Sequence, residues 1–227
     1  MKLWIRFLLI FFAITFPFFL IMTSIRVVLT PIFPEIEYRT PDFPDDPFGF
    51  TFTDRLTWSK VSIDYLVNDS GIDFLASRKL PSGTPLFNQR ELSHMLDVKN
   101  LTQTVLKIWL ILSILYITLF FLAWKVKFLI GFYKSVISGG WLTIGLIILI
   151  LIGVFVSFET LFTDFHRIFF TGNSWLFYTS DSLIRLFPER LWQDVFLAIG
   201  GIAVLFSIGS IFLGRKMAKS LKNDNSF

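Results

Sequence analysis

The chain has 227 residues, of which 54% are hydrophobic, 18% aromatic and 17% charged, with a formal net charge of +4. A soluble domain usually carries about 25% charged residues, so this chain is too apolar for a disordered or an ordinary soluble protein. It contains no Cys, which excludes a disulfide-stapled secreted fold, a Cys-ligated metal centre and a cysteine nucleophile. The composition is typical of a membrane protein.

Four uncharged runs are long enough to cross a bilayer core of about 30 Å, which needs about 20 residues of helix. The runs are Phe7–Ile25, Ile108–Trp124, Trp141–Phe158 and Val195–Gly214. The first run lacks the small-residue cleavage pattern of a signal peptide, so we interpret it as a retained helix that Pro17 kinks. The sequence therefore predicts a polytopic α-helical membrane protein with four transmembrane helices. An extracytoplasmic domain of short strands plus a helix is expected between the first two spans.

Basic residues near the ends of the runs predict the orientation of the chain. The N-terminus, the connection between the second and third runs, and the C-terminal tail together carry nine Lys or Arg and a single acid, Asp224. Cytoplasmic segments of membrane proteins are enriched in Lys and Arg, so we expect both termini in the cytoplasm. The basic balance is then a topology signal and does not indicate nucleic-acid binding.

The two long polar segments differ in their patterns. Residues 30–87 begin with a segment rich in Pro. Polar and apolar residues then alternate over Gly49–Trp58 and Lys60–Val67, which predicts short strands. From Asn88 the pattern is helical, and Asn88 with Glu91 has the spacing of a capping box. The predicted order is transmembrane helix 1 over residues 1–29, an extracytoplasmic domain over 30–104, helix 2 over 105–127, a cytoplasmic loop over 128–139, helix 3 over 140–162, an extracytoplasmic interfacial loop with a short helix over 163–191, helix 4 over 192–214 and a cytoplasmic tail over 215–227.

The two histidines, His94 and His166, both fall on the predicted external side. On a helix, Glu91, His94 and Asp97 are spaced three residues apart, and a neighbouring carboxylate can orient an imidazole. A helix running straight into the second span would place His94 about 20 Å beyond the start of that span. The two rings are therefore expected to meet through a helix lying along the membrane surface, or through a bend near Asn100. A single such histidine would indicate only a solvated loop, but two in polar patches at one membrane face favour a site.

Several classes of function remain to be weighed. Glu91-x-x-His94 fits half of a carboxylate-bridged metal site, to which Asp164-x-His166 could add ligands. A second Glu-x-x-His is missing, so we expect neither a metal nor another cofactor. A serine hydrolase is disfavoured because the sequence has no Gly-x-Ser-x-Gly motif. An ion-coupled transporter is disfavoured because the four uncharged runs contain no acidic or basic residue. The alternatives that remain are a membrane lipid-ester hydrolase, with or without a metal, and a non-enzymatic membrane-anchored sensor or assembly factor.

Two blocks of the sequence resemble the Lit family, the lipoprotein intramolecular transacylases of low-GC Gram-positive bacteria. One block is Arg90-Glu91-Leu92-Ser93-His94-Met95-Leu96-Asp97-Val98. The other runs from His166 to Trp175 and continues over Asp181 to Glu189. The order of four spans, with a large first external segment and a short second one, is similar along the whole chain.

This resemblance implies an acyltransferase that moves the sn-2 acyl chain of a diacylglyceryl lipoprotein onto the α-amino group of its N-terminal Cys, giving a lyso-form lipoprotein. The implied partners are the diacylated lipoprotein and membrane lipids. Histidines matching His94 and His166 are the expected catalytic pair, with His166 as the base and His94 as its partner, or the reverse. Residues expected to orient or bind the substrate are Arg90, Glu91, Asp97, Arg167, Trp175 and Asp181.

Overall fold

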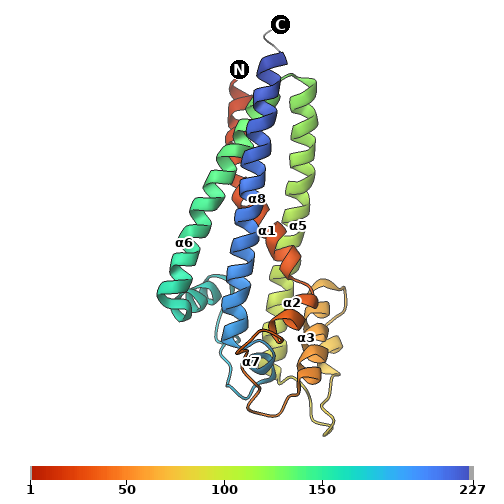
Figure 1. Ribbon diagram of the computed structural model, residues 1–227. Coiled ribbons are helices and arrows are strands. Elements are labelled where there is room, and N and C mark those ends of the chain that lie inside the picture. The colour runs from red at the N-terminus through yellow and green to blue at the C-terminus, as the bar shows by residue number, and fades with distance from the viewer. Residues whose placement is uncertain (1, 225–227) are drawn as a thin grey trace. The chain divides into compact units, whose positions relative to one another are not determined.

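The computed structural model describes residues 2–224, which form helices joined by loops (Figure 1). The helices are α1 (Leu3–Val28), α2 (Ile32–Glu37), α3 (Phe52–Val67), α4 (Asp73–Ala76), α5 (Gln89–Lys125), α6 (Leu129–Phe169), α7 (Ser182–Leu186) and α8 (Glu189–Asp224). Four of them, α1, α5, α6 and α8, are long and apolar enough to cross a membrane. This confirms the prediction of four spans. Of the predicted tail, α8 includes residues up to Asp224, while 225–227, like Met1, lie outside the described residues.

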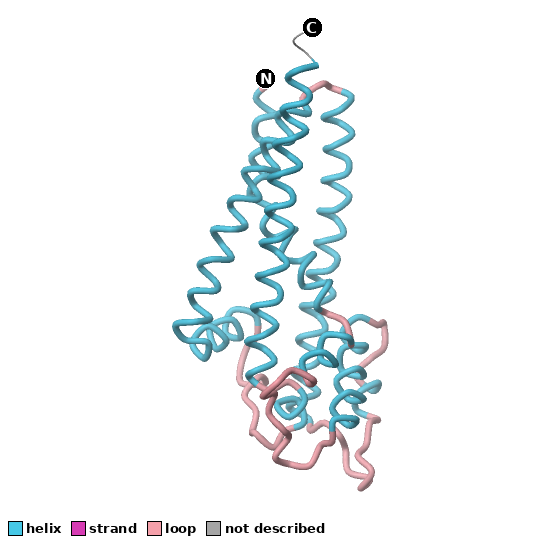
Figure 2. The backbone as a smooth tube through the Cα atoms, in the orientation of Figure 1, coloured by secondary structure: helices cyan, strands magenta, loops and turns pink. Residues whose placement is uncertain are grey.

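The predicted strands are wrong. Over the described residues the backbone is helix or loop (Figure 2), and β pairing there is limited to one bridge, between Lys79 and Pro85. Most of the segment expected to form strands is α3 instead. Its start is fixed by a capping box, in which Asp54 N donates to Thr51 Oγ1 at 3.2 Å and Thr51 N donates to the Asp54 carboxylate at 2.9 Å.

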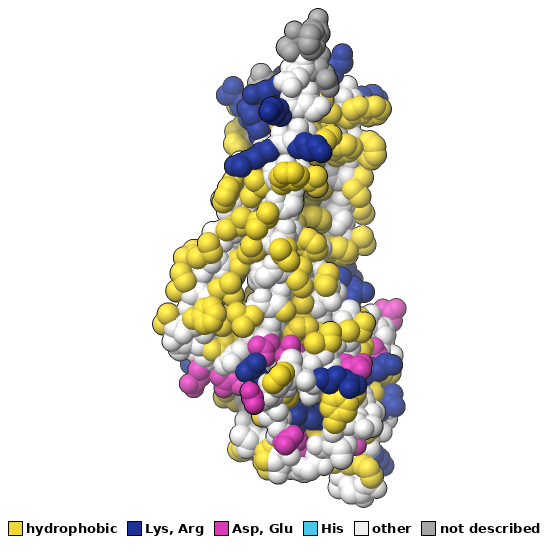
Figure 3. Space-filling model, viewed as in Figure 1, with side chains coloured by type: hydrophobic (Ala, Val, Ile, Leu, Met, Phe, Trp, Pro, Cys, Tyr) yellow, Lys and Arg dark blue, Asp and Glu magenta, His cyan; other side chains and the backbone are white. Residues whose placement is uncertain are grey.

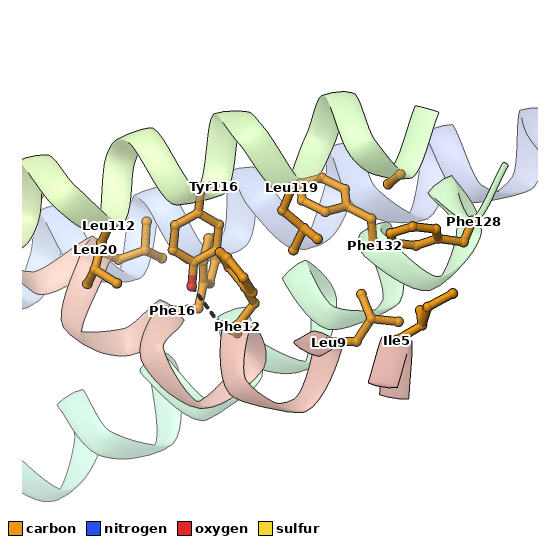
Figure 4. Close-up of a cluster of buried hydrophobic side chains, with 11 residues drawn as sticks. Ile5, Leu9, Phe12, Phe16, Leu20, Leu112, Tyr116, Leu119, Phe128 and Phe132 are labelled. Carbon is orange, nitrogen blue, oxygen red and sulfur yellow. Dashed lines mark hydrogen bonds between the residues drawn. The ribbon is translucent and has the colours of Figure 1, made fainter. Parts of the chain in front are cut away.

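The chain divides into two compact units, each described here by itself. Unit 1 comprises Met1–Arg26, Leu106–Ile152 and Leu197–Phe227. Figure 4 shows part of its core, where aromatic rings of α1 and α5 interlock and Tyr116 Oη donates to the Phe12 carbonyl at 2.6 Å. Gly139 permits a close approach of α6 to α1, since a Cβ there would lie 2.5 Å from Phe16 Cβ. Tight aromatic packing and small residues thus hold these helices together.

The surface of unit 1 is divided by residue type. Lys and Arg side chains gather at the end that holds both termini, and hydrophobic side chains cover much of the helix sides in this view (Figure 3). Large apolar residues are well exposed there, including Leu149, Leu205 and Phe212. Helices in a bilayer expose such side chains to lipid, with basic residues at the cytoplasmic ends.

Unit 2 comprises Val27–Val105 and Gly153–Phe196. Its core joins side chains of α3, α4, α5 and α7 and of the loop before α5: Tyr65, Leu75, Leu86, Phe87, Leu92, Met95, Leu183 and Leu186. The loop before α3 is fixed to α7 by a buried ion pair, in which Arg185 Nη2 lies 2.9 Å from Asp46 Oδ2. Burial raises the pKa of the Asp46 carboxyl, but hydrogen bonds from Arg185 and Phe50 N outweigh that effect and leave the pKa below its usual value.

The last part of α6 follows an interruption. Ser157 has extended backbone angles (φ −161°, ψ 91°) inside an otherwise helical segment. Its Oγ donates to Thr160 Oγ1 at 2.8 Å and accepts from Thr160 N at 3.4 Å, the contacts of a helix N-cap. The helix axis therefore changes direction at Ser157, and Figure 1 shows this change as the sharp turn of α6 before residues 158–169.

Candidate active site

His94 and His166 lie side by side within unit 2. Their ring centroids are 5.9 Å apart with an interplanar angle of 26°, and each residue is only 8% exposed. The expected route to this contact was wrong, because α5 runs without interruption from Gln89 to Lys125. The interruption lies in α6 at Ser157 instead, ahead of the segment that carries His166.

Aromatic side chains surround the imidazole pair. The Phe170 ring lies 5.0 Å from that of His94 and 5.5 Å from that of His166, so it touches both. Phe177 lies 5.3 Å from His94, and Trp175 lies 5.1 Å from His166. These contacts keep water from much of the surface of the rings.

Hydrogen bonding distinguishes the two rings. His166 Nδ1 lies 2.7 Å from the Phe162 carbonyl oxygen. A carbonyl can only accept, so Nδ1 carries the proton, and in the neutral ring the lone pair is on Nε2. His94 Nδ1 is buried and has no hydrogen-bond partner among the described residues. Burial of two adjacent imidazoles disfavours a positive charge on either one, so the site presents two neutral rings.

Arg90 and Asp181 form an ion pair near the two imidazoles. The Asp181 carboxylate accepts from Arg90 Nη2 at 2.8 Å, from Asn88 Nδ2 at 2.9 Å and from Tyr178 N at 2.9 Å. The Arg90 guanidinium also lies over the Tyr178 ring, 4.8 Å from its centroid. These contacts join the start of α5 to the loop that carries Phe177.

Glu91 occupies the same junction. Its Oε2 accepts from Asn88 N at 2.8 Å, and Asn88 Oδ1 accepts from Glu91 N at 3.1 Å, which confirms the predicted capping box. Glu91 Oε1 accepts from Leu183 N at 2.7 Å. The carboxylate is only 1% exposed and binds backbone N–H groups on both oxygens. In the structure it therefore supports the position of α5 and α7.

The remaining predicted site residues lie in different environments. Asp97 follows His94 by one helical turn, accepts from Ser174 Oγ at 3.3 Å and borders an open cavity of about 340 Å³. The Arg167 side chain is 70% exposed and pairs with Asp164 at 3.6 Å on the surface. Within residues 2–224, no three metal-ligating side chains gather closely enough to hold an ion.

Sequence reasoning missed three contributors to the site. Phe162 supplies the backbone acceptor for His166, and the rings of Phe170 and Phe177 pack on the imidazoles. Phe162 precedes His166 by four residues, so helical spacing could have indicated it. Phe170 and Phe177 come after the helix, where no periodicity points to their neighbours.

The comparisons with known proteins identify the family. The family model described as lipoprotein intramolecular transacylase Lit matches residues 10–192. A protein of Aquifex aeolicus, described as uncharacterized, is 31% identical over 214 residues, covering 92% of this chain and 94% of its own.

Solved structures show the same fold. The membrane-integral lipoprotein intramolecular transacylase Lit from Bacillus cereus has a TM-score of 0.76 at 20% identity, covering 98% of this chain and 97% of its own. A variant of that protein with a histidine-to-arginine mutation has a TM-score of 0.72 at 22% identity, covering 96% and 92%. With the family model matching most of its length, the chain belongs to the lipoprotein intramolecular transacylase Lit family.

Proposed function

We propose that this chain is an integral membrane acyltransferase that moves the sn-2 acyl chain of a diacylglyceryl lipoprotein onto the α-amino group of its N-terminal Cys. The product is a lyso-form lipoprotein with one N-linked and one O-linked chain. Membership of the family supports the reaction class. The observation that carries the proposal in this chain is the buried pair of neutral imidazoles, 5.9 Å apart, with one ring oriented as a base.

In the proposed mechanism His166 is the base and His94 its partner. The neutral α-amine attacks the carbonyl carbon of the sn-2 ester, and His166 Nε2 takes the proton that the nitrogen loses. His94 donates a hydrogen bond to the developing oxyanion. The C–N bond forms, the C–O bond to glycerol breaks, and the protonated His166 returns its proton to the departing alkoxide. General base catalysis of this kind contributes roughly 10²–10⁴-fold.

Two physical effects favour transfer to the amine over hydrolysis. The amine and the ester belong to one molecule, so holding them in line replaces a bimolecular encounter, which can supply about 7–11 kcal/mol in the best-oriented cases. The imidazoles are only 8% exposed and are packed against aromatic rings, which limits the access of water to the ester. No covalent acyl-enzyme is required.

The proposal includes a membrane orientation. The enzyme is a multi-pass protein with both termini in the cytoplasm and its active site on the extracytoplasmic side, where residues 30–104 and 163–191 form the segments around the site. The excess of Lys and Arg in the terminal segments and in the connection between the second and third spans supports this orientation. Membrane lipids surround the spans, and the diacylated lipoprotein is the substrate.

The test is mass spectrometry of a reporter lipoprotein exposed to the protein and to its His94→Ala and His166→Ala variants. We expect the wild type to convert the diacyl form into the lyso form with both acyl chains retained, and each variant to be roughly 10²–10⁴-fold slower. Loss of one acyl chain from the reporter would indicate the hydrolase instead, and its sensitivity to a chelator would indicate a metal. An unchanged reporter N-terminus with every form of the protein would favour the non-enzymatic sensor.

A further inference from the structure

An open cavity of about 340 Å³ begins beside the imidazole pair. One wall is a face of α5 with Asp97, Asn100 and Thr104, and the other is formed by residues 169–171. Phe170 belongs to this second wall, and its ring also touches both imidazoles, at 5.0 and 5.5 Å. A group bound in the cavity would therefore lie next to the Phe170 ring, which separates the cavity from the two imidazoles.

Asp97 places a carboxylate at the edge of this cavity. Among the described residues it receives one hydrogen bond, from Ser174 Oγ at 3.3 Å, and has no ion pair. The basic residues of the same helix stretch are used elsewhere. Arg90 pairs with Asp181, and Lys99 Nζ donates to the Ser70 carbonyl at 2.6 Å and to Asn68 Oδ1 at 3.1 Å. Among the described residues, no ion pair therefore neutralises the Asp97 carboxylate at the edge of the cavity.

The substrate supplies a cation of the right kind. The pKa of a free α-amino group is about 7.7–8.0, so near pH 7 the N-terminal Cys arrives mainly as a primary ammonium group. A bilayer interface is a poor place for an unpaired charge. An ammonium bound by a carboxylate forms a charge-assisted hydrogen bond, which is stronger than a neutral one.

We propose that this cavity binds the α-ammonium group of the diacylglyceryl-cysteine N-terminus, with Asp97 as its counter-ion and the side-chain oxygens of Asn100 and Thr104 as further acceptors. The inference rests on the proposed function and adds a selection step before the reaction. Because the cavity is open, the bound ammonium loses its proton to solvent as it leaves Asp97, and the neutral amine then attacks the ester beside His166. A lipoprotein with a free α-amine is bound, whereas an N-acylated one leaves Asp97 without a partner and is released. Asp97 is then a specificity-determining residue, and the product, whose amine has become an amide, no longer fits the site.

The cavity could instead hold part of an acyl chain. The lining is mixed, since Leu101, Phe169 and Phe170 are apolar while Asp97, Asn100, Thr104 and Thr171 are polar. A carboxylate without an ion pair at its edge favours a cationic group over a hydrocarbon chain. An acyl chain would bind equally well whether or not the amine is blocked, which gives the test its second outcome.

The experiment compares two probes, a diacylglyceryl-cysteine peptide with a free amine and the same peptide with an N-acetyl group. Binding is measured in the His166→Ala background, so that neither probe reacts. We expect the free-amine probe to bind roughly tenfold or more tightly than the acetylated one, the factor typical of a hydrogen bond to a charged group. Asp97→Asn should abolish this preference, whereas Asp97→Glu, which keeps the charge, should retain most of it.

A matched control removes a carboxylate elsewhere in unit 2. Asp73 is exposed at the start of α4, outside the cavity lining, so Asp73→Asn should leave the preference unchanged. With His166 intact, Asp97→Asn should raise KM for the free-amine peptide roughly tenfold or more while kcat changes less. Equal binding of the two probes to the parent protein, or a preference that survives Asp97→Asn, would overturn the inference.

These readouts separate this inference from the proposed function. A wild type that makes the lyso form, with Asp97→Asn showing the same KM and probe preference, would disprove the role of Asp97 and leave the reaction standing. A wild type that makes no lyso form, yet prefers the free amine through Asp97, would disprove the reaction and support the ammonium site.

Discussion

The position of one proton determines what each imidazole can do. His166 Nδ1 donates to the Phe162 carbonyl, which leaves Nε2 as the basic nitrogen of a neutral ring. His94 Nδ1 is buried and has no such partner among the described residues, so no hydrogen bond there fixes the tautomer of this ring. Both histidines are evident from the sequence, but the assignment of base and donor depends on a backbone carbonyl, which carries no sequence signal of its own.

Glu37, at the end of α2, leads to a prediction about stability. It is buried, and its Oε2 has no hydrogen-bond partner among the described residues. Burial raises the pKa of Glu37 to about 7, the nearby Asp194 carboxylate adds to the rise, and Arg190 opposes it. The folded protein therefore binds more protons than the unfolded chain between about pH 4.5 and pH 7, so stability falls as the pH rises through that range.

Glu37→Gln removes the ionisation and should raise the melting temperature at pH 8. We expect a gain of roughly 2–4 °C, the shift that about 1 kcal/mol produces in a chain of this size, and a clearly smaller gain at pH 5. Thermal unfolding of the detergent-solubilised protein measures both. Glu35→Gln is the control, since Glu35 is exposed and pairs only with Arg39 at the surface. Equal gains for Glu37→Gln at the two pH values would contradict the assignment.

The start of α5 and the loop before α7 are held together by Asp181, which receives three hydrogen bonds. Asp181→Asn removes the ion pair with Arg90 and should loosen the loop that places Trp175 and Phe177 on the imidazoles. We expect kcat to fall roughly 10- to 100-fold with KM less affected, because small misplacements of reacting groups are costly. Amide hydrogen exchange over residues 174–183 should become faster. Normal exchange in a variant with reduced kcat would rule out this positioning role.

Ser157 caps the helical segment that follows it in α6, and this role can also be tested by substitution and amide exchange. Ser157→Ala removes the hydroxyl that accepts from Thr160 N, and loss of an N-cap costs about 0.5–2 kcal/mol. We expect a lower melting temperature and faster amide exchange over residues 158–169, followed by reduced activity because this segment carries His166. Ser157→Thr keeps a capping hydroxyl and should behave like the wild type. Equal behaviour of the Ala and Thr variants would show that the cap does not hold this segment.

These elements show how far local pattern predicts the fold. The four spans and the Asn88–Glu91 capping box follow from hydrophobic run length and from residue spacing, both of which are local. Alternating polarity favoured strands over Gly49–Trp58 and Lys60–Val67. The Thr51–Asp54 capping box instead starts a helix, in which the buried residues Arg55, Ser59 and Ser62 follow one another at the four- and three-residue spacing of one helix face. The contact of the two imidazoles depends on an irregular Ser157 backbone inside a continuous apolar run, which hydropathy cannot detect.

For the molecule as a whole, the exposed apolar helix surface and the candidate site are formed by different residues. Large apolar side chains, such as Leu149 and Leu205, are exposed on unit 1. Every residue of the candidate site belongs to unit 2. Composition alone indicates the membrane class, whereas the orientation rests on the distribution of Lys and Arg near the ends of the spans.

The orientation can be tested directly because the chain contains no Cys, so that each introduced thiol is a single reporter. We expect Ser82→Cys, in the exposed loop between Lys79 and Pro85, to react with a membrane-impermeant maleimide on intact cells. Ser220→Cys, exposed near the end of α8, should react only after permeabilisation. Leu149→Cys should react under neither condition: Leu149 is 68% exposed on the helix surface, but in a bilayer that surface faces lipid, where no thiolate forms. Labelling of Ser220→Cys on intact cells would reverse the topology and place the imidazole pair on the side of the membrane opposite to the mature lipoprotein.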